Sequence, residues 1–266
     1  MKFHAGAALR AHHRRTAPLL PEDFAETGLF VQRSGGVPKR FQVLGERSSG
    51  TNFLHRLLVR NTGLQPSEAL GWKHGHPSAI AIPADLAVIC LVRHAADWAL
   101  SMHMKPWHAT PALQELDFAA FLRAPWTSTV DRARYFDERT ALEGQPLQAD
   151  RDPVTGRVAD SLPALRRAKL AGLLSYLNRG CTCALLRMEV LQAAPEATLD
   201  RLSAGLGLPP RKGAFQGVTK RLGAKFKPAV PVRPMTPAAL TAEDMAFLRD
   251  GLDLGVEAQL GYRYAP

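Results

Sequence analysis

Residues 41–60 read FQVLGERSSGTNFLHRLLVR, and this stretch decides the fold. The apolar run 41–44 predicts a buried strand, the small residues of 45–52 predict a loop, and four apolar residues at helical spacing predict a helix over 51–61. A strand, a small-residue loop and a helix form the layout that binds phosphate, because the loop N–H groups and the positive end of the helix dipole attract the same anion.

The loop carries several groups suited to an anion. Arg47 adds a full positive charge, and Gly50 allows close approach of the backbone. Further hydrogen-bond donors are Ser48, Ser49, Thr51 and Asn52. An ATP-type P-loop is excluded, because its Gly-Lys-Ser/Thr ending occurs nowhere in the chain. The simpler alternative is an ordinary turn whose polar residues cap the helix.

Length and composition indicate one α/β domain. With 266 residues, of which 46% are hydrophobic, the chain can bury one sizeable core, and we expect a domain over 38–266 behind a basic extension over 1–37. The 34 basic and 24 acidic residues give a net charge of +10, which attracts anionic partners. Three cysteines without a Cys-x-x-Cys pair predict neither a disulfide framework nor a zinc site.

Strands and helices alternate along the rest of the chain. Residues 86–92 are apolar throughout, as in a central parallel strand, a second strand is expected over 181–187, and a short one is expected to end near 70–72. This alternation predicts a three-layer α/β fold, a parallel sheet flanked by helices, with ligands at the carboxyl ends of the strands. Helices are predicted over 95–104, 118–122, 163–177, 195–204 and 241–252.

The helix over 163–177 combines leucines with basic residues. We expect its leucines on the buried side, and Arg166, Arg167 and Lys169 largely on the exposed side.

A second group of polar residues follows the strand over 86–92. Arg93 stands at the strand end and Ser101 two helical turns later, so both side chains can reach one anion. With the loop over 45–52, this ordered pair resembles the sulfotransferase family that uses 3′-phosphoadenosine 5′-phosphosulfate (PAPS). Residues 185–191 are weakly similar to a further segment of that family.

The resemblance implies a P-loop NTPase-like α/β fold, with PAPS as co-substrate, 3′,5′-adenosine bisphosphate as product and no metal. The 5′-phosphosulfate would lie on the N–H groups of residues 48–52, while Arg93 and Ser101 would bind the 3′-phosphate. Phe53 matches a position where many relatives carry a Trp against adenine, and packing in the helix core is an equal alternative for it.

Sulfuryl transfer needs a base for the acceptor proton and a cation for the leaving phosphate. The run Lys73-His74-Gly75-His76-Pro77 lies where relatives carry Lys-Thr-His-x-Pro, so we expect His74, with His76 second, to be the base. Ser48 occupies the position of a catalytic lysine in the family. Arg47 or Lys73 is therefore expected to supply the missing charge.

Two other classes of function remain open at this point. A nucleotide kinase or other NTPase of related fold would need a phosphate-binding lysine and a magnesium ligand, both missing at the usual places. A non-catalytic anion or nucleic-acid binder is suggested by the charge, but the chain lacks a basic stripe with interleaved aromatics. Without a continuous apolar stretch at its N-terminus or a segment of membrane-spanning length, the protein is expected to be cytoplasmic.

The sequence does not name the acceptor or an oligomeric state. We expect acceptor walls in 102–110, 126–136 and 140–162, whose aromatic residues suit a ring-bearing acceptor or simply pack in the core. The basic residues within 220–227 form either a lid over the anion or a solvated face.

Overall fold

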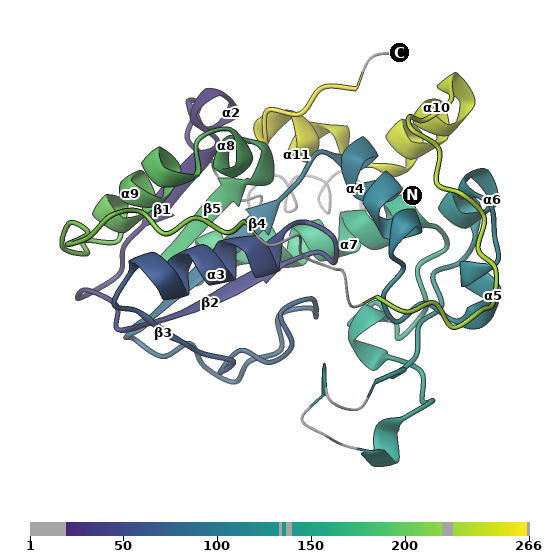
Figure 1. Ribbon diagram of the computed structural model, residues 1–266, viewed down its shortest axis with the longest axis horizontal. Helices are drawn as coiled ribbons and strands as arrows, with labels where there is room; N and C mark the ends of the chain where they lie inside the picture. The colour runs from purple at the N-terminus through teal and green to yellow at the C-terminus, as the bar shows by residue number, and fades with distance from the viewer. Residues whose placement is uncertain (1–19, 133–134, 137–139, 220–225, 265–266) are drawn as a thin grey trace, which may run out of the picture.

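The computed structural model describes residues 20–132, 135–136, 140–219 and 226–264. Five strands of these residues form one mixed sheet in the spatial order β1-β5-β4-β2-β3 (Figure 1). β1 runs antiparallel to β5, and the other neighbouring strands pair in parallel. The strands are β1 (Leu29–Gln32), β2 (Arg40–Gly45), β3 (Gln65–Pro66), β4 (Leu86–Val92) and β5 (Cys183–Arg187).

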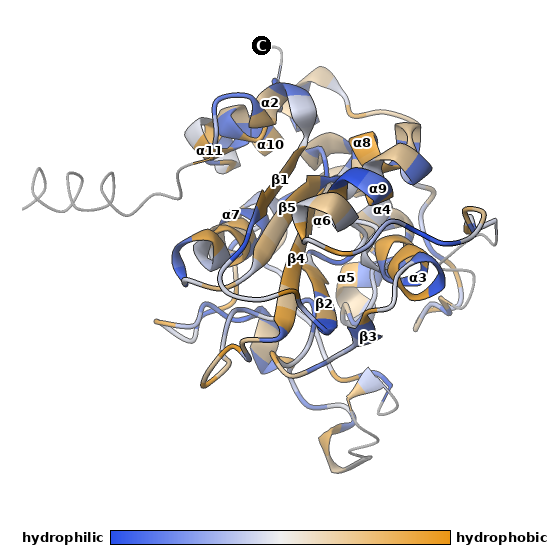
Figure 2. Ribbon diagram, turned by 90° about the vertical axis from the view of Figure 1, so that its left-hand side faces the viewer, coloured by the Kyte–Doolittle hydropathy of each residue, from blue (hydrophilic) through white to orange (hydrophobic). Residues whose placement is uncertain are grey.

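Helices cover both faces of the sheet, and Figure 2 shows α7 and α3 on opposite sides of the apolar strands. α7 (Leu162–Leu174) and α11 (Leu254–Gln259) pack on one face. α3 (Thr51–Asn61), α8 (Met188–Ala193) and α9 (Pro195–Gly205) pack on the other. The remaining α-helices are α2 (Phe24–Thr27), α4 (Ala95–Met104), α5 (Pro111–Gln114), α6 (Phe118–Arg123) and α10 (Ala242–Gly251).

β4 is the centre of the core. All seven of its residues are buried, because a parallel strand with helices on both faces has no solvent side. Alternate side chains point to opposite faces of the sheet. Val88 and Cys90 therefore pack with α7, while Ile89 and Leu91 pack with α3. The predictions of a strand over 86–92 and of a helix over 95–104 are confirmed residue by residue.

The short strand expected to end near 70–72 corresponds to β3, which ends earlier, at Pro66. Residues 68–72 make turns, and their backbone is bonded to the side chain of Gln42 in β2. Gln42 accepts a hydrogen bond from the N–H of Leu70 and donates one to the carbonyl of Gly71. An amide side chain thus provides the partners that a neighbouring strand would otherwise supply.

The N-terminal boundary and the strand direction also differ from expectation. Part of the segment 1–37 belongs to the fold, since α2 and β1 lie within it and β1 pairs along β5, while residues 1–19 lie outside the described part. The antiparallel β1 makes the sheet mixed rather than parallel. A strand of four residues is too short to carry a readable period in the sequence.

The loop over 45–52 lies at the point where the strand order reverses. From β2 the chain moves to β3 on one side and then to β4 on the other, so the tips of β2 and β4 are neighbours. Ligands of open α/β sheets bind at such a reversal, beyond the carboxyl ends of the strands. The topology therefore points to the same edge of the sheet as the loop sequence.

Gly45, the last residue of β2, offers a test of how closely these tips approach. A Cβ at this position would lie 2.7 Å from the carbonyl oxygen of Leu91, which is backbone and cannot move aside. Gly45→Ala should therefore destabilise the protein by about 1–3 kcal/mol. Gly63→Ala is the matched control, because nothing lies within 4 Å of its added Cβ, and it should change stability by less than about 1 kcal/mol. Urea unfolding measures both, and equal stability of the two variants would contradict the close approach.

Candidate functional site

The loop after β2 has the backbone of an anion cradle. Ser48 and Gly50 both adopt left-handed conformations, with φ of 62° and 97°. Such residues let successive N–H groups of a turn face one concavity. Within the described part of the chain, the N–H groups of Gly50, Thr51 and Asn52 at the start of α3 have no protein acceptor. These donors are free for a ligand.

The second predicted anchor reaches this loop. The Nη1 atom of Arg93 lies 2.8 Å from the Oγ atom of Ser101 and 3.0 Å from the carbonyl oxygen of Ser48. Ser101 is carried by α4, and Arg93 directly follows β4. The structure thus brings together the three groups that the sequence placed 45 and 8 residues apart.

Arg93 also has a charge without a counter-charge. It is half-buried, and its guanidinium contacts a carbonyl and a hydroxyl, both neutral. No carboxylate of the described residues pairs with it. A partly desolvated arginine with only neutral partners gains more interaction energy from a bound anion than an arginine that is already paired with a carboxylate.

Lys73 supplies a second cation that contacts the loop. Its Nζ atom donates to the Oδ1 atom of Asn52 at 2.6 Å, and its carbonyl accepts from the N–H of Gly45. Burial lowers the pKa of Lys73, although the charge of Glu68 acts in the opposite direction. Lys73 is thus a lysine whose ammonium group contacts the start of α3.

The side chains of His74 and His76 have different surroundings. The Nδ1 atom of His74 lies 2.6 Å from the carbonyl oxygen of Gly45, so Nδ1 carries the proton and Nε2 remains an acceptor. Burial, and next the charge of Lys73, lower the pKa of His74 well below its usual value. His76 instead lies against Gly172 of α7, and its Nε2 atom is buried without a partner. Only His74 touches the loop.

Arg47 does not take the position expected for it. Its side chain is buried, its Nη2 atom pairs with the Oδ2 atom of Asp150 at 2.7 Å, and its guanidinium lies 4.9 Å from the ring centre of Trp126. The expectation of Arg47 as a ligand-binding or catalytic cation is thus not supported, because its charge is already balanced inside the protein. Phe53 is half-buried and packs against the core beneath α3.

Arg166 anchors both strand tips from below. It is fully buried and bonds Glu46 in the loop at 2.6 Å, Glu257 of α11 at 2.7 Å and the carbonyl of Arg93 at 2.9 Å. Although burial works against its charge, Glu46 and Glu257 raise the pKa of Arg166 above its usual value. The prediction that Arg166 is exposed is wrong, since this side chain connects the two anchors of the site.

Lys169 was expected to be exposed as well, and it is buried too. Its Nζ atom bonds the carbonyls of His74 and Ala149 and lies 3.2 Å from the Oδ1 atom of Asp150. Burial lowers the pKa of Lys169 to about 8. Although burial acts in the opposite direction, Arg47 and Lys169 hold the pKa of Asp150 below its usual range. Lys169 thus holds the backbone of the candidate base.

A readable signal for these two residues was present in the sequence. The buried side of α7 follows the helical stripe i, i+3, i+4, i+7, i+8, i+11. Arg166 and Lys169 occupy two of those positions, between leucines. The stripe consists of Leu162, Leu165, Arg166, Lys169, Leu170 and Leu173.

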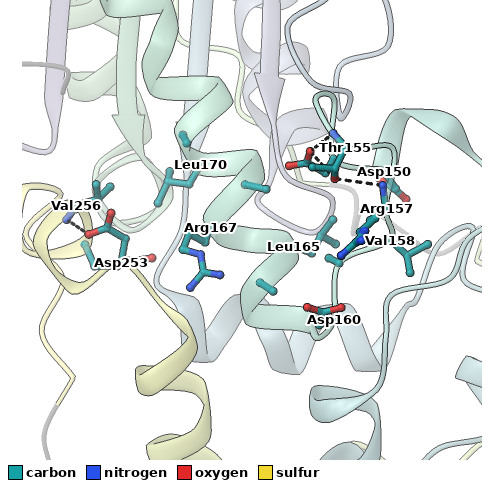
Figure 3. A pocket seen from close by; sticks show the side chains of 16 residues that line it. Asp150, Thr155, Arg157, Val158, Asp160, Leu165, Arg167, Leu170, Asp253 and Val256 are labelled. Carbon is teal, nitrogen blue, oxygen red and sulfur yellow. Dashed lines mark hydrogen bonds between the residues drawn. The ribbon is translucent and has the colours of Figure 1, made fainter. Parts of the chain in front are cut away.

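A larger concavity than the strand tips offer lies elsewhere among the described residues. A groove of about 500 Å³ runs along α7, between residues 150–160 and α11 (Figure 3). None of the loop residues 45–52 lines it, nor do Arg93 and Ser101. We place the candidate site at the strand tips, because the unpaired cations and the reversal of strand order coincide there and not in the groove. No group of three or more His, Cys, Asp or Glu within the described ranges could hold a metal ion.

Glu46 gives a test of the buried support through pH. Burial raises the pKa of Glu46 from 4.5 to about 7, so the folded state binds this proton more tightly than the unfolded state. The corresponding stability is present below the unfolded pKa and is lost as the pH rises through about 7. Between about pH 5 and about pH 8, the wild type should lose about 1–3 kcal/mol more stability than Glu46→Gln. Glu115→Gln, at an exposed glutamate, should follow the wild type in urea unfolding.

The tautomer of His74 gives a second test. We expect a neutral imidazole with the proton on Nδ1 that does not titrate down to about pH 6.5, the ordinary midpoint of a histidine. The ¹⁵N chemical shifts of the ring measure this directly, with the signal assigned by its loss in His74→Gln. An imidazolium at that pH, or a proton on Nε2, would contradict the geometry.

Within the described ranges, no helix is both long and apolar enough to cross a bilayer. Comparison with known proteins finds no match for the chain, neither among protein-family models nor among curated proteins or solved structures.

Proposed function

We propose that the protein is a PAPS-dependent sulfotransferase with a P-loop-like α/β fold, acting on a hydroxyl or amine acceptor. The observation that carries the proposal is the meeting of Arg93, Ser101 and Ser48 at the reversal of strand order. A ligand with two separated phosphate-type groups suits this edge, because Arg93 and the cradle of residues 48–52 offer two adjacent anion sites.

The two ends of the co-substrate would divide between these groups. In this proposal the 5′-phosphosulfate lies on the N–H groups of residues 48–52 with Lys73 beside it, and the 3′-phosphate lies against Arg93 and Ser101. Lys73 takes the role that the sequence had left open between it and Arg47, since the charge of Arg47 is balanced by Asp150.

The reaction itself would be an in-line displacement at sulfur. The acceptor oxygen or nitrogen forms a bond to sulfur while the bond from sulfur to the 5′-phosphate oxygen breaks, and the acceptor proton passes to Nε2 of His74. Loop N–H groups and Lys73 stabilise the charge that develops on the leaving phosphate. With its proton on Nδ1, His74 keeps Nε2 as the acceptor for that proton, while its lowered pKa makes it a weaker base than an ordinary histidine.

Two alternatives differ from this proposal in measurable ways. A nucleotide kinase or NTPase would turn over ATP with magnesium, but the residue that follows Gly50 is Thr51 and not the lysine of an ATP-type P-loop. A non-catalytic nucleic-acid binder would show steep salt dependence with oligonucleotides and no response to adenosine bisphosphate.

Titration calorimetry with two nucleotides tests the proposal. 3′,5′-Adenosine bisphosphate should bind more tightly than 5′-AMP, which lacks the 3′-phosphate. Arg93→Ala should weaken the bisphosphate about 10–100-fold, as for loss of a charged hydrogen bond of about 1.5–3 kcal/mol, and should leave 5′-AMP unchanged. The preference for the bisphosphate should therefore disappear in this variant.

Arg201→Ala is the charge-matched control, because Arg201 is an exposed arginine of α9 outside the site. It should bind both nucleotides as the wild type does. The proposal fails if the wild type binds neither nucleotide at high micromolar concentration, or if Arg93→Ala weakens both ligands equally.

A further inference from the structure

Two tyrosines contact the residue that follows Arg93 beyond β4. They are Tyr262 and Tyr264, in a segment over 261–264 that comes after α11 and that we call the tyrosine segment. The ring centre of His94 lies 5.5 Å from that of Tyr262 and 4.8 Å from that of Tyr264. Tyr262 is buried and Tyr264 is half-buried, so the segment packs closely at this edge of the sheet.

Tyr262 reaches the backbone after Arg93 through a glutamate beyond β5. Its hydroxyl donates to the Oε2 atom of Glu189 at 2.9 Å, and the Oε1 atom of the same carboxylate accepts from the N–H of His94 at 2.7 Å. Glu189 belongs to α8, which directly follows β5. One carboxylate thus joins the tyrosine segment to the first residue after Arg93.

Tyr264 acts at the start of α4. Its hydroxyl donates to the Oε2 atom of Glu257 at 2.7 Å and accepts from the N–H of Ala95 at 3.2 Å. The first N–H groups of a helix have no partner within the helix, so this hydroxyl provides an acceptor that the helix itself lacks. The same helix carries Ser101, whose hydroxyl contacts Arg93.

The backbone that follows β4 is therefore held at three successive residues. The carbonyl of Arg93 is held by Arg166, and the two N–H groups after it are held by Glu189 and by Tyr264. Arg166 and Tyr264 bond the same oxygen, Oε2 of Glu257, at 3.1 and 2.7 Å. Two of the three attachments thus involve a hydroxyl group of the tyrosine segment. A binding side chain keeps its place only where packing and hydrogen bonds fix the residues that support it.

We propose that Tyr262 and Tyr264 are positioning residues for Arg93. Their hydroxyl groups hold the backbone of residues 94 and 95 where the guanidinium of Arg93 can reach Ser101 and the loop. The consequence for ligand binding rests on the proposed function, whereas the consequence for the contact between Arg93 and Ser101 does not. A purely structural role of the tyrosines would instead lower stability and weaken every nucleotide alike.

Crystal structures without nucleotide test the positioning directly. Tyr264→Phe keeps the ring against His94 and removes the hydroxyl. The distance from Nη1 of Arg93 to Oγ of Ser101, 2.8 Å in the wild type, should lengthen beyond about 3.5 Å in this variant. An unchanged contact would overturn the proposal.

Two further variants complete this comparison. Tyr262→Phe removes the other hydroxyl and should lengthen the same contact, so the test stands if Tyr264→Phe does not fold. Tyr176→Phe is the matched control, because Tyr176 is a buried tyrosine of η4 (Ser175–Asn178) outside the site, and it should leave the contact as in the wild type. A lengthened contact in the control as well would also overturn the proposal.

Titration calorimetry tests the consequence for binding. The preference for 3′,5′-adenosine bisphosphate over 5′-AMP should fall about 3–10-fold in Tyr264→Phe, as for loss of one hydrogen bond, with the affinity for 5′-AMP unchanged. Tyr176→Phe should keep the preference of the wild type. A preference that Tyr264→Phe leaves intact, or equal weakening of both nucleotides, would overturn the proposal. A wild type without any preference contradicts the proposed function, and the crystal structures then decide this inference by themselves.

Discussion

One buried guanidinium holds the functional edge of this protein together. Arg166 has no exposed surface, and it bonds Glu46 beyond β2, the carbonyl of Arg93 beyond β4, and Glu257 of α11. A charge can be buried only when it is paired and its hydrogen bonds are satisfied, so these three segments must meet around it. The distance between the two anion anchors is thereby set by a side chain that touches neither ligand position.

The cations near the loop fall into two groups by their partners. Arg47, Arg166 and Lys169 lie below the loop, where they pair with Asp150, Glu46 and Glu257. The guanidinium of Arg93 contacts the carbonyl of Ser48 and the hydroxyl of Ser101, and the ammonium of Lys73 contacts the amide oxygen of Asn52, with the charge of Glu68 acting on it as well. The groups that can attract an anion here are therefore these two side chains and the free N–H groups of the loop. Arg47 is not one of them, although its position within the loop sequence predicts an anion ligand.

Local signals explain which parts of this arrangement could be predicted from the sequence. β4 and α4 have the predicted bounds, because an all-apolar run and a helical period are readable within ten residues. Ion-pair partners are distant in the sequence. Arg166 and its partner Glu46 are 120 residues apart, and Arg47 and its partner Asp150 are 103 residues apart. The composition of the segment around Asp150 predicts an exposed loop. Charge was taken as a sign of exposure for Arg166 and Lys169, although both continue the apolar stripe of α7. The shortest strands, β1 and β3, carry too few residues for any period.

The same buried cluster supports the backbone of a loop that contains no lysine. The side chains of Glu46 and Arg47 are buried. The residues between them and α3 are all small, namely Ser48, Ser49 and Gly50. The left-handed conformations of Ser48 and Gly50 then need a rigid base, because a non-glycine residue such as Ser48 adopts one only where the surroundings enforce it. That base is the buried cluster of paired charges, and the helix N-terminus, Lys73 and Arg93 supply the positive field above the loop. Support and recognition are thus divided between the two sides of one eight-residue loop.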